Sequence, residues 1–191
     1  PGHADLPEAE RTNGAADLRG GGTQSGRLTL GLVAAGSIAR NLIGDAMVEA
    51  HCSQIGPIKG RIDGTRDGEA CDVLNCNDSE AAEEMFALVK ALRKQGDSIG
   101  SSVECCISNL PIGLGEPWFE GLEPALARGL MAIPAARAVE FGRGKDVVRM
   151  QGSEHNDAWG IEQTPVGSNP DGALGGMSTG APLRIQVHFK P

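Results

Sequence analysis

The order of apolar and polar residues predicts two different kinds of helix in the first half of the chain. Residues 26–43 are apolar on nearly every side and are followed by Gly44, so we expect a buried helix there. Residues 79–95 instead carry a single apolar stripe, with glutamates in the early turns and Lys and Arg residues in the last turn. Asp78 or Ser79 can cap this second helix, and the glycine after it can end it. The stripe favours core packing over a surface for a partner.

The second half of the chain combines one more helix with alternating strand patterns. A third helix is predicted over residues 117–133, with a proline in its first turn and another after its end. Strands are predicted over residues 103–107 and 183–190, where apolar and polar residues alternate. Residues 138–141 and 147–150 are expected to pair with each other as a hairpin. No regular strand–helix–strand repeat is present, so we expect an α+β layered fold in a single domain.

Length, charge and cysteine content argue against several classes of protein. The chain has 191 residues, enough for one sizeable core, and a formal net charge of −8 with no Tyr, which argues against nucleic-acid binding. No apolar run reaches the roughly 18 residues of a membrane span and no signal-like pattern opens the chain, so we expect a cytoplasmic protein without membrane contact. Its five cysteines form no Cys-x-x-Cys pair, which favours buried reduced thiols over a reactive cysteine, a disulfide framework or a metal site.

A glycine run just before the first predicted helix is the strongest candidate for a binding site. Gly20, Gly21 and Gly22 leave the backbone N–H groups free of Cβ obstruction. The helix that follows presents unpaired N–H groups and the positive end of its dipole. With Arg19 and Arg27 on either side, the loop suits a phosphate or a phosphorylated cofactor. Its spacing matches neither the P-loop nor the dinucleotide pattern, and a flexible turn is the alternative interpretation.

A second glycine-bearing segment, residues 160–180, is too long to be an ordinary turn. We interpret it as a loop whose backbone approaches a ligand. A mobile linker is the alternative interpretation of the same residues.

Six short blocks rich in glycine and charged residues follow one another along the chain. They are Pro1-Gly2-His3-Ala4-Asp5, Arg19-Gly20-Gly21-Gly22 with Ser25-Gly26-Arg27, Gly96-Asp97-Ser98-Ile99-Gly100, Gly113-Leu114-Gly115-Glu116-Pro117, Gly152-Ser153-Glu154-His155-Asn156-Asp157, and Leu174-Gly175-Gly176 with Phe189-Lys190-Pro191. Each block alone is weak evidence. In this order, and over residues 1–191, they closely resemble the chorismate synthase family.

The resemblance implies a lyase of the shikimate pathway, which leads to the aromatic amino acids. Members of that family convert 5-enolpyruvylshikimate 3-phosphate to chorismate by anti-1,4-elimination of phosphate, with reduced FMN as cofactor and no net oxidation. The family is also associated with NADP, with a homotetramer, and with helices packed between antiparallel sheets. By this resemblance the chain is an internal fragment of the catalytic domain, lacking an N-terminal and a C-terminal part, and we expect it to be inactive alone.

The resemblance also implies roles for individual residues. His3 corresponds to a catalytic histidine beside the flavin, where an imidazole that titrates near neutral pH can give and take a proton; a turn-capping histidine is the alternative. Arg27 is a candidate substrate-binding residue for phosphate, with a surface ion pair as the alternative. Cofactor contacts are implied at Thr23, Gln24, Ser25, Pro134, Ala135, Gly175 and Lys190.

Two functions of other classes stay open on the sequence alone. The glycine loop and its arginines could belong to a non-catalytic module that binds a phosphorylated ligand. The apolar helix predicted over residues 26–43 could instead serve a structural oligomerisation domain.

Overall fold

The computed structural model describes residues 4–161, 165–167 and 172–191, and its contacts divide the chain into two compact units. Unit 1 comprises Pro1–Gly44 with Ile133–Ala135, and unit 2 comprises Asp45–Ala132 with Ala136–Pro191. Each unit is described separately below.

Unit 1 consists of two helices joined by the glycine loop. Its elements are α1 (Asp5–Arg11), the 3-10 turns Arg19–Gln24 and Gly26–Leu28, and α2 (Thr29–Ala39). Asp5 and Glu8 lie in the first turn of α1 and Arg11 lies in its last, an arrangement that the helix dipole favours. Ser25 caps the second 3-10 turn because its hydroxyl accepts a hydrogen bond from the Arg27 backbone N–H.

The apolar helix predicted over residues 26–43 is present, but the prediction that it is buried is wrong for this chain. None of the residues of α2 is buried, and Leu30, Val33 and Ile38 are 76%, 69% and 70% exposed. The physical reason is that, among the described residues of unit 1, no other element covers its apolar sides. Burial of an apolar side chain needs a second surface as well as an apolar pattern.

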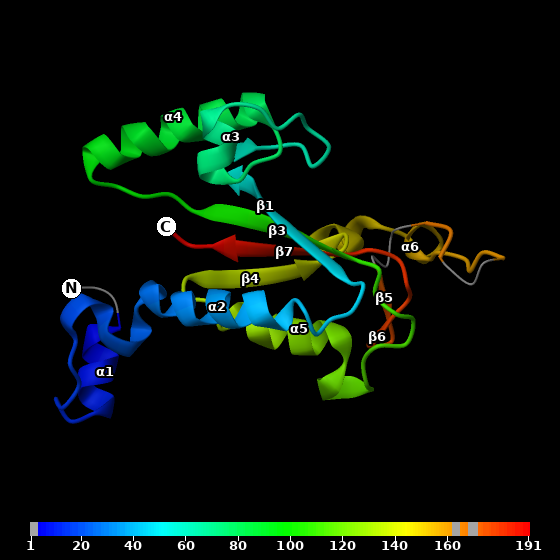
Figure 1. Cartoon of the computed structure of the whole chain (residues 1–191), viewed down its shortest axis with the longest axis horizontal. Coiled ribbons are helices and arrows are strands. Elements are labelled where there is room, and N and C mark those ends of the chain that lie inside the picture. Colours follow the sequence, from blue (N-terminus) through cyan, green and yellow to red (C-terminus); the bar gives the residue numbers. More distant parts are fainter. Residues whose placement is uncertain (1–3, 162–164, 168–171) are drawn as a thin grey trace. The chain divides into compact units, whose positions relative to one another are not determined.

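Unit 2 is built on a five-stranded antiparallel sheet with strand order β2-β1-β3-β7-β4 (Figure 1). The strands are β1 (Met47–Ile55), β2 (Ile58–Lys59), β3 (Ser101–Ser108), β4 (Ala136–Phe141) and β7 (Leu183–Phe189), and a separate two-stranded ribbon pairs β5 (Ala173–Leu174) with β6 (Met177–Ser178). The strand patterns predicted over residues 103–107 and 183–190 are confirmed as β3 and β7, which pair with each other. Together with the helices, this sheet confirms the predicted α+β class.

The main hydrophobic core of unit 2 lies where α3 (Glu69–Leu74) and α4 (Ser79–Gln95) pack beside the β1–β2 end of the sheet (Figure 1). The predicted helix over residues 79–95 is confirmed with both ends, because Asp78 accepts a hydrogen bond from the Ala81 N–H and Gly96 takes a left-handed conformation. Its stripe is also confirmed as core, since Met85 is completely buried. Asn75 ends α3 and joins it to β1 by two hydrogen bonds of 2.8 Å.

The helix predicted over residues 117–133 is found as a 3-10 turn at Trp118–Glu120 followed by α5 (Leu122–Met131), which lies beside β4. The predicted hairpin of residues 138–141 with 147–150 is wrong. Strand β4 pairs with β7 instead, and residues Gly144–Arg149 form a 3-10 turn before the short helix α6 (Gly152–His155). The edge of β7 offers β4 buried apolar neighbours, which a two-stranded hairpin would lack.

The two faces of the sheet differ in polarity along its central strands. One face carries buried apolar residues, among them Ile107, Ile185 and Val187. The opposite face carries polar partners, with Glu104 beside Gln186 in the register of β3 and β7. Among the described residues, no helix has both the length and the apolar character needed to span a bilayer.

Candidate functional site

The glycine loop of unit 1 adopts a backbone that only glycine accepts readily. Gly20, Gly21 and Gly22 have φ values of 64°, 88° and 52°, all in the left-handed region. At Gly22 a Cβ would also lie 2.8 Å from the carbonyl oxygen of Asp17. The sequence prediction of a loop without side-chain obstruction therefore corresponds to a real conformational requirement at all three positions.

Arg27 folds back onto this loop. Its guanidinium donates to the Gly20 carbonyl oxygen at 2.7 Å and to the Ser25 hydroxyl at 3.1 Å. The alternative interpretation, a surface ion pair, is not among the contacts found for Arg27 in the described residues. Arg27 thus closes the loop that begins at Gly20, and the predicted triplet Thr23, Gln24 and Ser25 lies inside that closure.

A cavity of about 430 Å³ lies between α1 and the loop, within unit 1. Its lining residues are Glu8, Thr12, Ala15, Ala16, Asp17, Arg19, Gly22 and Thr23. The volume falls in the range of about 300–1,000 Å³ that is typical of small-molecule sites. Arg19 donates to both carboxylate oxygens of Asp17, and these hydrogen bonds lower the pKa of Asp17. The positive charge of Arg19, which the sequence suggested for binding an anion, is therefore partly neutralised by Asp17.

Pro134 and Ala135 belong to the same compact unit as the triplet Thr23 to Ser25. Ala135 has a φ of 71°, a left-handed value that costs an L-residue about 1–2 kcal/mol. Such strain persists where surrounding structure holds it, and it is concentrated at functional sites. Ala136, the next residue along the chain, pairs with Phe189, which immediately precedes the predicted contact Lys190.

Gly175 and Lys190 both belong to unit 2. Gly175 is in the turn between β5 and β6, and a Cβ on it would meet nothing within 4 Å. It lines a cavity of about 650 Å³ together with His155 and Glu123, whose pKa is raised by burial. Lys190 directly follows β7 and does not line this cavity, so the two predicted contacts are not found at one cavity.

Two further predictions concern residues that lie wholly or partly outside the described ranges. The candidate catalytic residue His3 lies outside the described residues, and so does part of the segment 160–180. Its role and the interpretation of that segment stay predictions.

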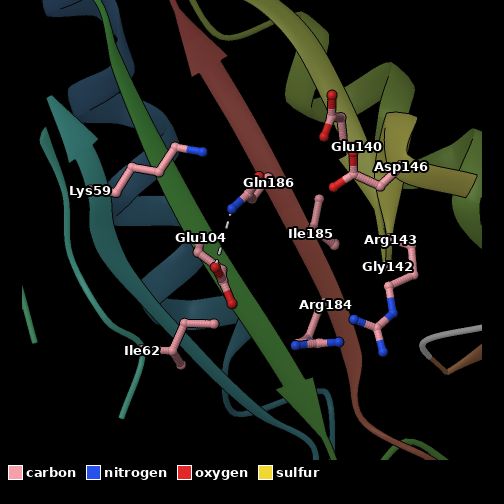
Figure 2. A pocket seen from close by; sticks show the side chains of 10 residues that line it. All are labelled: Lys59, Ile62, Glu104, Glu140, Gly142, Arg143, Asp146, Arg184, Ile185 and Gln186. Carbon is pink, nitrogen blue, oxygen red and sulfur yellow. Dashed lines mark hydrogen bonds between the residues drawn. The ribbon is translucent and has the colours of Figure 1, made fainter. Parts of the chain in front are cut away.

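The polar face of the sheet holds a third cavity, of about 260 Å³ (Figure 2). Gln186 donates to the buried Glu104 carboxylate at 3.3 Å, as the dashed line in Figure 2 shows. Arginines 143 and 184 and the carboxylates Glu140 and Asp146 also line it. None of the predicted site residues lines this cavity, and its charges are of both signs.

Sequence reasoning missed one residue beside the glycine loop. Glu8 is only 8% exposed, lines the same cavity as Gly22 and Thr23, and accepts two hydrogen bonds from Arg11. The signal available in the sequence was the acid and base three residues apart, a spacing that places both on one helix face. Among the described residues, no group of three or more metal-binding side chains is found.

Comparison with known proteins agrees with the block order found in the sequence. A family profile described as chorismate synthase matches residues 1–191. A chorismate synthase from Dehalococcoides mccartyi is 41% identical over 199 residues, covering 100% of this chain and 55% of the relative, and one from Aeropyrum pernix is 44% identical over 202 residues, covering 100% and 53%. A crystal structure of chorismate synthase superposes with a TM-score of 0.85 at 25% identity, covering 98% of this chain and 62% of the other. This chain spans about half the length of these curated relatives, and it belongs to the chorismate synthase family.

Proposed function

We propose that this chain is part of an enzyme that forms chorismate from 5-enolpyruvylshikimate 3-phosphate by anti-1,4-elimination of phosphate. The observation that carries this proposal is the family match over the whole chain, residues 1–191. Because the chain spans about half of each curated relative, the activity belongs to a longer polypeptide, in which both compact units are parts of one catalytic domain.

The cofactor of this proposal is reduced FMN, and the residues of unit 1 fit such a group. The left-handed glycines keep side chains away from the loop, and the cavity beside it is large enough for a ligand. Thr23, Gln24 and Ser25 offer hydroxyl and amide groups to the polar edge or the phosphate of a flavin. Ala135, held in a strained conformation, and Pro134 provide a fixed backbone contact. When bound, the reduced flavin supplies transient electron density to the substrate.

Arg27 is proposed to bind the phosphate of the substrate. Its guanidinium is already directed at two oxygen atoms, those of Gly20 and Ser25, and phosphate oxygens present the same kind of acceptor with a full negative charge. His3 is proposed to exchange a proton with the flavin. Gly175 and Lys190 are proposed as further backbone and side-chain contacts to the cofactor.

Three further properties that the family implies are also proposed for the full-length protein. They are a homotetramer of the full-length protein, a cytoplasmic location and an association with NADP. The five cysteines are free thiols, which agrees with a reducing compartment. Sedimentation of the full-length protein would test the tetramer directly.

The main test is an anaerobic assay of the full-length protein that contains this chain. With chemically reduced FMN and the phosphorylated substrate, we expect chorismate and inorganic phosphate in equal amounts. His3→Ala is expected to lower turnover sharply, whereas His51→Ala, at a histidine assigned no role, should not. Binding of the phosphorylated ligand without any elimination would overturn the proposal and favour the non-catalytic binding module.

A further inference from the structure

The carboxylate of Glu104 is buried in the central strand of the sheet without a positively charged partner. Glu104 lies in β3 and is 5% exposed. Its side chain accepts a hydrogen bond from the neutral Gln186 amide at 3.3 Å, and none of the ion pairs found among the described residues includes it. His51 lies directly opposite in the register of β1 and β3, but its Nε2 is buried with no hydrogen bond. Burying a carboxylate is costly unless a cation compensates its charge, so this position lacks a cation.

Glu104 lines the cavity of about 260 Å³ on the polar face of the sheet, within unit 2. Charged residues of both signs line the same cavity, and they are separated from each other. Figure 2 shows Arg143 and Arg184 at one end and the carboxylates Glu140 and Asp146 at the other. These residues come from β3, β4, β7 and the turn after β4, so the sheet fixes their relative positions.

The two arginines suit the carboxylate group of a ligand. A guanidinium has five N–H donors in a planar fork that matches the two oxygens of a carboxylate. Arg143 and Arg184 each take part in other interactions within the chain. Five donors are enough to serve those interactions and a ligand oxygen together.

An ammonium group suits Glu104 better than a metal ion does. Among the described residues, no group of three or more metal-binding side chains is found. Lys59 and the two arginines also line the cavity and would repel a divalent ion more strongly than a single ammonium charge. An ammonium group has three N–H donors, and its hydrogen bonds to a carboxylate are roughly twice as strong as those between neutral groups.

We propose that this cavity binds a small zwitterion, a free α-amino acid, whose ammonium group pairs with Glu104 and whose carboxylate is held by Arg143 and Arg184. The volume is below the range of about 300–1,000 Å³ that is typical of drug-sized ligands, which agrees with a ligand of this size. The inference goes beyond the proposed function, since none of the residues assigned to cofactor or substrate lines the cavity.

The experiment is isothermal titration calorimetry of the full-length protein that contains this chain. The protein amino acids are titrated one at a time, and we expect at least one of them to bind with a dissociation constant of about 1 mM or tighter. The amino acid that binds best is then compared with the amine and the acid that each lack one of its charged groups; for L-alanine these are ethylamine and propionate. Each one-charge probe should bind at least about tenfold more weakly than the amino acid.

Substitutions locate the bound amino acid. Glu104→Gln keeps the size of the side chain and removes its charge, and we expect it to weaken binding about tenfold or more. Glu49→Gln is the matched control, because Glu49 is an exposed glutamate of the neighbouring strand β1 and does not line the cavity. It should leave the affinity within about twofold. Arg143→Gln, at an exposed residue, should weaken binding as Glu104→Gln does, and it keeps the test open even if Glu104→Gln fails to fold.

Three results would overturn the inference. They are the absence of binding by every amino acid, an unchanged affinity in Glu104→Gln or in Arg143→Gln, and an amine or acid probe that binds as tightly as the amino acid. Formation of chorismate enters none of these measurements, so the inference and the proposed function can fail independently of each other.

Discussion

Helices α2 and α4 differ both in the distribution of their apolar residues and in the burial of those residues. In α4 the apolar residues form one stripe, and Ala81, Ala82 and Met85 on that stripe are buried. In α2 the apolar residues lie on all sides, and none is buried. The more apolar of the two helices is thus the one without buried residues.

The difference shows what a pattern can and cannot predict. A stripe indicates which side of a helix faces a core, and in α4 the residues that complete the core come from nearby parts of the same unit. An all-round apolar helix indicates that it is surrounded, without identifying what surrounds it. The curated relatives are nearly twice as long, so their polypeptides include segments that have no counterpart in these 191 residues.

Met85→Ala in α4 gives the largest effect that this comparison predicts. The side chain is completely buried in the core formed by α3, α4 and the β1–β2 end of the sheet, so its removal leaves a cavity. We expect a loss of about 2–5 kcal/mol in the free energy of unfolding. Urea unfolding followed by tryptophan fluorescence measures it in unit 2, which contains both Trp118 and Trp159. Glu84→Ala, on the exposed side of α4, is the control; equal losses in both variants would contradict the prediction.

The cap of α4 gives a pH-dependent effect. Arg61 donates to the buried Asp78 carboxylate from its side chain at 2.9 Å and from its backbone at 3.0 Å, and these bonds lower the pKa of Asp78 to about 2. Because the pKa is lower in the folded state than its ordinary value of 3.8, the stabilisation is complete above pH 3.8 and is lost as the pH falls toward 2.

Comparison with Asp78→Asn isolates this contribution from the other carboxylates. We expect the variant to unfold at a lower urea concentration than the unsubstituted chain at neutral pH, and the difference to shrink as the pH falls from 3.8 to about 2. Asp63→Asn, at an exposed carboxylate nearby, serves as the control. A difference that stays constant over this pH window would show that the charge of Asp78 has no part in the cap.

The end of α4 gives a smaller effect that depends on backbone conformation. Gly96 has a φ of 73°, and a Cβ there would meet nothing within 4 Å, so Gly96→Ala costs only the left-handed strain of about 1–2 kcal/mol. Gly129, inside α5, also has open space around it but an ordinary helical backbone. Gly129→Ala should therefore stabilise unit 2 by about 0.5–1 kcal/mol. Glycine-to-alanine substitution is therefore expected to lower the free energy of unfolding at Gly96 and to raise it at Gly129. A decrease at both sites would contradict the prediction.

The parts of the fold that could be predicted are those in which local chemistry decides. The cap residue, stripe and terminal glycine of α4 all agree with one another, and β7 alternates along its whole length. The predicted strand over residues 147–150 failed because β-branched residues favour a strand only where a partner edge is free, and β4 paired with β7 instead. Strand β1 was missed although its polar residues Glu49 and His51 alternate with small or apolar ones, because a register shift between Cys52 and Gln54 interrupts the alternation.

The candidate site was predictable to a similar degree. The glycine loop was found because three adjacent glycines require an unusual backbone, which the structure has at each of them. Glu8 was missed because its burial depends on the contact between α1 and the loop, which no local pattern encodes. The finding that Gly175 lines a cavity and Lys190 does not likewise depends on tertiary structure, since the two residues are only 15 positions apart in the sequence.

Substitution of Leu32 in α2 gives the smallest effect, and it tests the uncovered side of the comparison. Leu32 is 61% exposed, and Leu and Ala have similar helix propensities, so Leu32→Ala should change the free energy of unfolding by no more than about 0.5 kcal/mol. Because unit 1 contains no Trp, far-ultraviolet circular dichroism is the suitable measurement. Leu32→Lys should be tolerated equally in the 191-residue chain and should reduce its self-association, since it interrupts an exposed apolar surface. A loss near that of Met85→Ala would mean that α2 is packed against another surface in solution, and the contrast between the two helices would then disappear.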